Sequence, residues 1–102
     1  MVDLDKGNYI DINCDEHLCK IIDLLERIGI EYYFRDDIEL ENVDFIYFGD
    51  TSLINFTTNI RGCKNMMILF ERGDNYRSIL KDYTAINRVS FKELISYEKQ
   101  TS

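Results

Sequence analysis

The sequence lacks the long apolar runs and leader features that would place a protein in or across a membrane. No stretch approaches the roughly 18 to 20 consecutive apolar residues that a membrane-spanning helix needs. The first residues, MVDLDKGNYID, contain two aspartates and no apolar segment, so no signal peptide is predicted. The three cysteines are an odd number and fit free thiols in a reducing compartment. We therefore expect a cytoplasmic protein.

Motifs for metal, phosphate or catalytic-triad chemistry are also missing. Asp11-x-Asn13-x-Asp15 begins like a calcium loop, but the sixth residue is Glu16 rather than glycine and the twelfth is Ile22 rather than glutamate. No glycine-rich phosphate loop occurs. We predict no catalytic residue, no metal and no cofactor, so the chain is not expected to be an enzyme.

Two enzyme-like arrangements are weaker alternatives. Cys14 lies at the start of a predicted helix, where the helix dipole favours a thiolate, but its spacing to Cys19 is not that of thiol-redox enzymes. Cys14 also falls on the apolar stripe of that helix, which favours buried packing. Three carboxylates could gather at one sheet edge and bind magnesium: Asp50, Glu71 and Asp74. The sequence provides no nucleophile or phosphate loop to accompany such a site, so a solvated strand edge is favoured.

Proline is absent and alanine occurs once, against 14 isoleucines and eight asparagines. This compositional bias does not indicate any particular mechanism. Apolar residues make up 45% and charged residues 30% of the 102 residues, which argues against disorder and predicts one domain, 1–102, with its own core. Residues 1–7 and 99–102 are expected to fray. The sequence shows no internal repeat, linker or low-complexity segment.

Charge is divided unevenly along the chain. Residues 1–50 contain 14 acidic and four basic side chains, whereas residues 51–102 contain five acidic and eight basic ones. The negative electrostatic field of the acidic first half repels nucleic acid and favours a protein partner with a basic surface. The alternative is that these acids are only solvated, or are neutralised by the other half of the fold. The predicted acidic interaction surface comprises Asp36, Asp37, Glu39, Glu41 and Asp44.

Short apolar runs and alternating patterns predict five strands, over 8–12, 30–34, 43–48, 66–70 and 86–89. A helix is predicted after Asn13 or Asp15, because apolar residues recur at three- and four-residue spacing until Gly29 stops it. A second helix is predicted from Gly73-Asp74 to Tyr83. A last helix follows Ser90, with Glu93 completing a capping box.

The segment 51–61 fits two structures. Ile54, Phe56, Thr58 and Ile60 alternate as in a strand, although Phe56 and Ile60 also belong to a helical stripe. We favour a helix, because the preceding polar residues can cap its start and Gly62 can end it. The order of elements is then β-α-β-β-α-β-α-β-α. It predicts a single small α/β domain with a mostly parallel or mixed sheet of four to five strands and four helices.

This order, together with the turn Asp50-Thr51-Ser52 between the apolar runs Val43-Asp44-Phe45-Ile46 and Met66-Met67-Ile68-Leu69, resembles a STAS domain. The family is typified by bacterial anti-sigma factor antagonists, and the resemblance extends from about Asn8 to Tyr97. The chain departs from the family pattern at Tyr47-Phe48-Gly49, which looks like an insertion, and in having one N-terminal strand instead of two. Leu53 also replaces a common glycine.

The resemblance implies a non-enzymatic regulatory module. A cognate kinase, anti-sigma factor or ATPase subunit would dock at the start of the 50–60 helix, and Ser52 or Thr51 would accept a phosphate beside Asp50. A helix over 51–61 between parallel strands would fit the family, whereas a hairpin would not. From the residues alone, Thr51 and Ser52 are equally a helix cap.

A second hypothesis uses the acidic segment instead. The chain would be a small acidic inhibitor or immunity-type protein that covers the basic active site of a nuclease or nucleic-acid-binding enzyme. In both hypotheses the partner is a protein rather than nucleic acid, and a homodimer is compatible with either.

Overall fold

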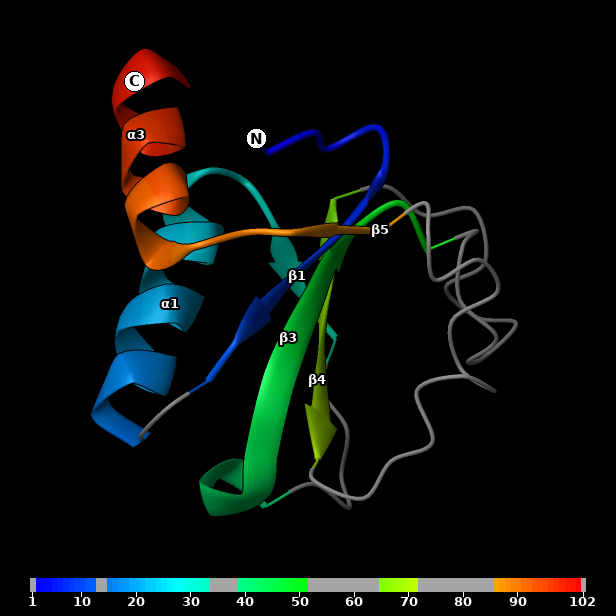
Figure 1. Cartoon of the computed structure of the whole chain (residues 1–102), viewed down its shortest axis with the longest axis vertical. Helices are drawn as coiled ribbons and strands as arrows, with labels where there is room; N and C mark the ends of the chain where they lie inside the picture. The colour runs from blue at the N-terminus through cyan, green and yellow to red at the C-terminus, as the bar shows by residue number, and fades with distance from the viewer. Residues whose placement is uncertain (1, 13–14, 34–38, 52–64, 72–85, 102) are drawn as a thin grey trace.

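The structure, a computed structural model, describes residues 2–12, 15–33, 39–51, 65–71 and 86–101. These residues form one five-stranded sheet with two α-helices, α1 (Asp15–Arg27) and α3 (Phe91–Thr101), packed on one face (Figure 1). A 3-10 turn, η1 (Leu40–Asn42), leads into the longest strand. The strands are β1 (Gly7–Asp11), β2 (Glu31–Tyr32), β3 (Val43–Gly49), β4 (Met66–Glu71) and β5 (Ile86–Arg88).

The predicted class of fold, a small α/β domain with a mixed sheet, is confirmed. A strand lies in each of the five predicted places. The described residues contain two of the four expected α-helices, and the helices predicted over 51–61 and 75–83 lie outside the described residues. The predicted order of elements, which includes those two helices, is therefore not confirmed. The helix-or-strand alternative for 51–61 also lies outside the described residues.

Of the two arrangements predicted, mostly parallel or mixed, the sheet has the mixed one. The order is β2-β4-β3-β1-β5, and the central strand β3 runs antiparallel to both of its neighbours, β4 and β1. Only the outer pairs, β1 with β5 and β2 with β4, are parallel. The apolar runs correctly indicate burial on both faces, but such runs carry no information about direction. The parallel strands that would flank residues 51–61 in the family pattern are therefore antiparallel here.

Both faces of the central strands are buried. Ile46 and Phe48 of β3 join the core beneath α1 and α3, whereas Phe45 and Tyr47 join a second cluster on the opposite face. β4 alternates in the same way, and Phe70 stacks on Phe45 with ring centroids 4.9 Å apart. The pairing of β3 with β4 shifts register between Val43 and Phe45, which is a bulge at the start of β3.

The two helices form where the pattern predicts them. α1 buries Leu18, Ile21 and Leu25, and Gly29 adopts a φ of +95° that favours glycine at the helix end. At the start of α3, the Ser90 hydroxyl accepts a bond from the Glu93 N–H at 3.2 Å, and the Glu93 carboxylate accepts one from the Ser90 N–H at 3.3 Å. This is the predicted capping box.

The ends of the chain were expected to fray. In the structure Val2 is buried in the core, with 6% of its surface exposed, and α3 continues through Thr101. The ion pair of Arg27 with Glu98, 2.7 Å between Nε and Oε2, joins the end of α1 to α3.

Candidate functional site

One backbone and one side-chain hydrogen bond hold the turn that follows β3. The Asp50 N–H donates to the carbonyl of Lys6 at 3.2 Å, and the Tyr47 hydroxyl donates to the Asp50 carbonyl. Asp50 is half-buried and Thr51 is buried, with 1% of its surface exposed. The third predicted docking residue, Ser52, lies outside the described residues. In this conformation the Thr51 hydroxyl is not accessible to a kinase.

Tyr47 lies beneath this turn and is fully buried. Burial raises the pKa of its hydroxyl well above the usual value, and the negative charge of Asp50 raises it further. The phenol is therefore neutral at physiological pH and acts as a hydrogen-bond donor. It holds the turn in place rather than serving as a base.

Asn8 also joins the N-terminal residues to the end of β3. Its side chain is completely buried, and its amide nitrogen donates to the carbonyls of Asp3 at 2.8 Å and of Lys6 and Phe48 at 3.3 Å each. The Asp3 N–H donates to the side-chain oxygen of Asn8, Oδ1, at 3.3 Å. Every polar atom of this buried amide has a partner, so the residue has a structural role.

The predicted acidic surface is partly described. Glu39 is exposed immediately before η1, Glu41 is exposed within it, and Asp44 is half-buried just inside β3. Asp36 and Asp37 lie outside the described residues. The η1 turn is fixed by two bonds, from the N–H and from the side-chain amide of Asn42 to Glu39, both of 2.9 Å. The two exposed carboxylates are thus presented on a defined turn.

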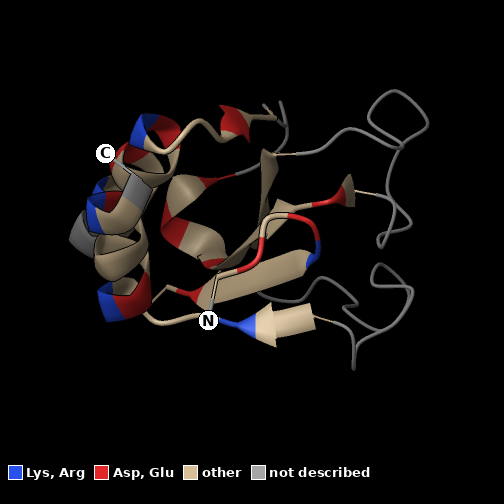
Figure 2. Cartoon of the chain, turned by 90° about the horizontal axis from the view of Figure 1, so that it is seen from above, with Lys and Arg blue, Asp and Glu red and all other residues tan. Residues whose placement is uncertain are grey.

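The same end of the molecule carries the end of β1. Asp11 is opposite Phe45 in the pairing of β1 with β3, and the Ile12 N–H donates to the Asp44 carbonyl at 2.9 Å. Figure 2 shows that Lys and Arg positions gather mainly on the two helices, whereas Asp and Glu positions also occupy the turns at strand ends. The pairing of β1 with β3 brings Asp11 beside the predicted acidic surface. The sequence analysis did not include Asp11 in that surface.

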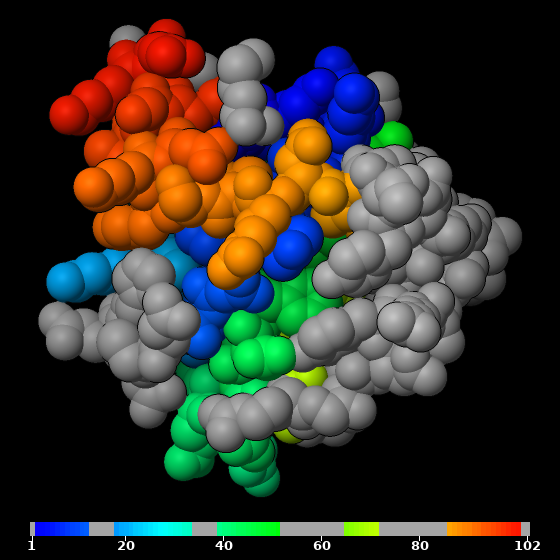
Figure 3. Space-filling view, viewed as in Figure 1, coloured from blue at the N-terminus to red at the C-terminus, as the bar shows by residue number. Residues whose placement is uncertain are grey.

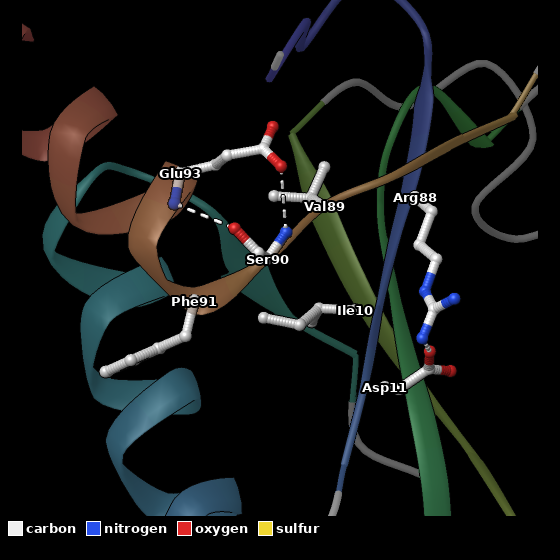
Figure 4. Close-up of a pocket in the computed structure, with 7 residues that line it drawn as sticks. All are labelled: Ile10, Asp11, Arg88, Val89, Ser90, Phe91 and Glu93. Carbon is white, nitrogen blue, oxygen red and sulfur yellow. Dashed lines mark hydrogen bonds and ion pairs between the residues drawn. The ribbon is translucent and has the colours of Figure 1, made fainter.

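A surface depression of about 440 Å³ lies between β1, β5 and the start of α3 (Figure 4). Asp11 and Arg88 form an ion pair there, with 2.7 Å between Oδ2 and Nη2. Sequence reasoning missed this pair because the two residues lie far apart in the chain, and no local motif links them. The remaining lining residues are Ile10, Val89, Ser90, Phe91 and Glu93.

Metal and thiol chemistry gain no support from the described residues. Within them, no group of three or more His, Cys, Asp or Glu side chains is arranged to hold a metal ion. Cys19 is an exposed free thiol on α1, while Cys14 and Cys63 lie outside the described part. Of the carboxylates considered for magnesium, Asp50 and Glu71 are half-buried and Asp74 lies outside the described residues.

No protein-family model, curated protein or solved structure gives a significant match to this chain. Among the described residues, neither helix has the length and apolar character to cross a membrane.

Proposed function

We propose that this chain is a non-enzymatic protein-binding module of the inhibitor or immunity type. Its acidic end would cover a basic site on a partner protein, such as the active site of a nuclease or nucleic-acid-binding enzyme. The observation that carries the proposal is the exposure of Glu39 and Glu41 at the η1 turn, where Asn42 makes two hydrogen bonds to Glu39. A preorganised charged turn loses little side-chain freedom on binding and steers association with a surface of opposite charge.

The surrounding charge supports this assignment. Asp44 and Asp11 lie at the same end as η1, and the first half of the sequence is strongly acidic. A partner that normally binds nucleic acid carries a basic cleft, so the same field that repels nucleic acid attracts this cleft.

The test begins with affinity purification of the partner from the source cells and continues with the purified pair. We expect Glu39→Gln with Glu41→Gln to weaken binding about tenfold, because two charges at the contact are lost. The matched control, Asp23→Asn with Glu26→Gln, removes two exposed acids of α1 and should change the Kd less than about twofold. Calorimetric titration at low and high salt measures the Kd of the partner for the wild type, the η1 variant and the α1 control.

Two results would contradict the proposal. Equal weakening by the η1 variant and the α1 control would show that only net charge matters. A Kd for the wild-type pair that does not change with salt would exclude recognition by exposed charges.

A second proposal follows the STAS resemblance, in which a regulatory kinase, anti-sigma factor or ATPase subunit docks at Asp50, Thr51 and Ser52. It is supported by the fixed position of Asp50 at the carboxyl end of β3. Because Thr51 is buried, this proposal assigns Ser52 as the residue that accepts the phosphate. Ser52→Asp should then change partner binding while the η1 variant binds normally, and the reverse result would reject this proposal.

A further inference from the structure

We propose that Leu40 is the apolar anchor of the interface and inserts into an apolar pocket of the partner protein that basic side chains surround. This inference rests on the proposed function, because that function places the η1 turn against a basic surface. It adds a contact of a different kind, since an apolar side chain holds a complex together by leaving water rather than by charge.

Leu40 is the large hydrophobic side chain that the described part of the chain leaves exposed, with 50% of its surface open to solvent. It is a member of neither core cluster, so the packing of the described core does not depend on it. A single exposed leucine is common on protein surfaces. The backbone and the charges around Leu40 are therefore what indicate a binding role.

Three hydrogen bonds hold the backbone that carries Leu40. The N–H and the side-chain amide of Asn42 donate to the carbonyl and the carboxylate of Glu39, both at 2.9 Å, and the Val43 N–H donates to the Leu40 carbonyl. Val43 is itself buried in the core at the start of β3, which joins the turn to the sheet. Because this backbone is already ordered, little of its conformational entropy is lost when a partner covers the turn.

The charges around Leu40 select the partner. Glu39 and Glu41 are both exposed beside it, and within the described ranges neither carboxylate has an ion pair. A second copy of the chain at this turn would bring acidic residues against acidic residues, which is unfavourable. The occupant that fits is a different protein, with lysine or arginine side chains around an apolar pocket.

The turn also lies where a partner can reach it. Figure 3 shows the residues of η1 and the start of β3, coloured green, at the lower end of the molecule and far from α3. An apolar centre with a charged surround is the usual arrangement of a protein interface. In such an interface the exposed charges mainly raise the rate of association, whereas burial of the central side chain slows dissociation.

The test uses the purified pair of the whole chain and its partner, with Leu40→Ala and the conservative variant Leu40→Met. We expect Leu40→Ala to raise the Kd about tenfold, because the apolar contact is lost. Leu40→Met keeps the apolar volume and should change the Kd less than about threefold. Calorimetric titration at several temperatures and at low and high salt measures the Kd and the heat capacity change of binding, which should be less negative for Leu40→Ala.

Salt separates this contact from the charges beside it. The loss caused by Leu40→Ala should be the same at low and high salt, whereas the loss caused by the double substitution of Glu39 and Glu41 should shrink at high salt. Urea denaturation is the folding control, and the midpoint of Leu40→Ala should equal that of the wild type because the side chain is exposed.

The proposal is overturned if Leu40→Ala binds the partner as the wild type does, or if its loss of affinity disappears at high salt. Either result, with salt-dependent binding of the wild type intact, removes the anchor and leaves the proposed function standing. A wild-type Kd that does not change with salt instead contradicts the proposed function, and with it the basic surround of the pocket.

Discussion

At the scale of single residues, the end of β3 is shaped by atoms that have almost no freedom. Gly49 has a φ of +121°, and a Cβ placed there would overlap the backbone carbonyl oxygen of Lys6. Asn8 fills the space beside it with a fully bonded amide. The close approach of β3 to the N-terminal turn therefore depends on the lack of a side chain at Gly49 and on the hydrogen bonds of the buried Asn8 amide.

Replacing Gly49 with alanine should lower the free energy of unfolding by about 2–3 kcal/mol, because both the φ and the contact with Lys6 become unfavourable. Gly29→Ala is the matched control, since its φ is also positive but nothing lies within 4 Å of the added carbon. It should cost about 1 kcal/mol. Urea denaturation measures both, and equal losses would contradict the predicted overlap.

Tyr47 makes the stability sensitive to alkaline pH. Since its pKa is raised in the folded state, the unfolded chain loses this proton first, and stability falls as pH rises above about 10. The slope from this residue approaches about 1.4 kcal/mol per pH unit. Tyr47→Phe should be less stable at neutral pH, because the bond to Asp50 is lost, but should show a shallower alkaline decline. Urea denaturation between pH 8 and 11 measures this, and parallel declines would refute the assignment.

At the scale of elements, each helix and strand in the described part of the chain lies where its local pattern predicts it, but the local patterns do not predict which strands pair. The runs at β3 and β4 are apolar throughout because both faces are buried, and the Ser90–Glu93 spacing marks the start of α3. The antiparallel direction of β3 depends on which edge of the sheet the chain returns to. No residue within the strand encodes that choice.

The candidate site divides in the same way. The acidic residues around η1 could be found from the sequence, because charge is a local property. The Asp11–Arg88 pair could not, since it arises only when β5 is placed parallel to β1. The burial of Thr51 was equally hidden, because it follows from packing at the end of β3 rather than from its neighbours in the chain.

The capping box gives a prediction at the level of the element. Ser90→Ala should lower the free energy of unfolding by about 1 kcal/mol, because the Glu93 N–H loses its acceptor at the helix start. Ser96→Ala, at an exposed position inside α3, should be neutral or slightly stabilising. Thermal unfolding followed by circular dichroism compares the two. A loss at Ser96 as large as at Ser90 would argue against the cap.

At the scale of the whole molecule, composition determines how the chain refolds. The sequence contains no proline, so no X-Pro bond has to isomerise during folding. We expect refolding from urea to lack a phase of tens of seconds that a prolyl isomerase accelerates. Stopped-flow and manual-mixing fluorescence, with and without the isomerase, measure this. An isomerase-sensitive slow phase would be inconsistent with the sequence.

The neighbouring positions of β1 and β5 also determine the order in which a ribosome can complete this fold. β1 leaves the ribosome early, but the strand that covers its outer edge is synthesised only after β2, β3 and β4. At about 5–20 residues per second, this edge remains unpaired for several seconds. A nascent chain that stops before Ile86 would expose a strand edge able to pair with other chains. The last strand of the sheet to be synthesised thus covers the edge of the first, and an incomplete chain would leave that edge open to pairing with other chains.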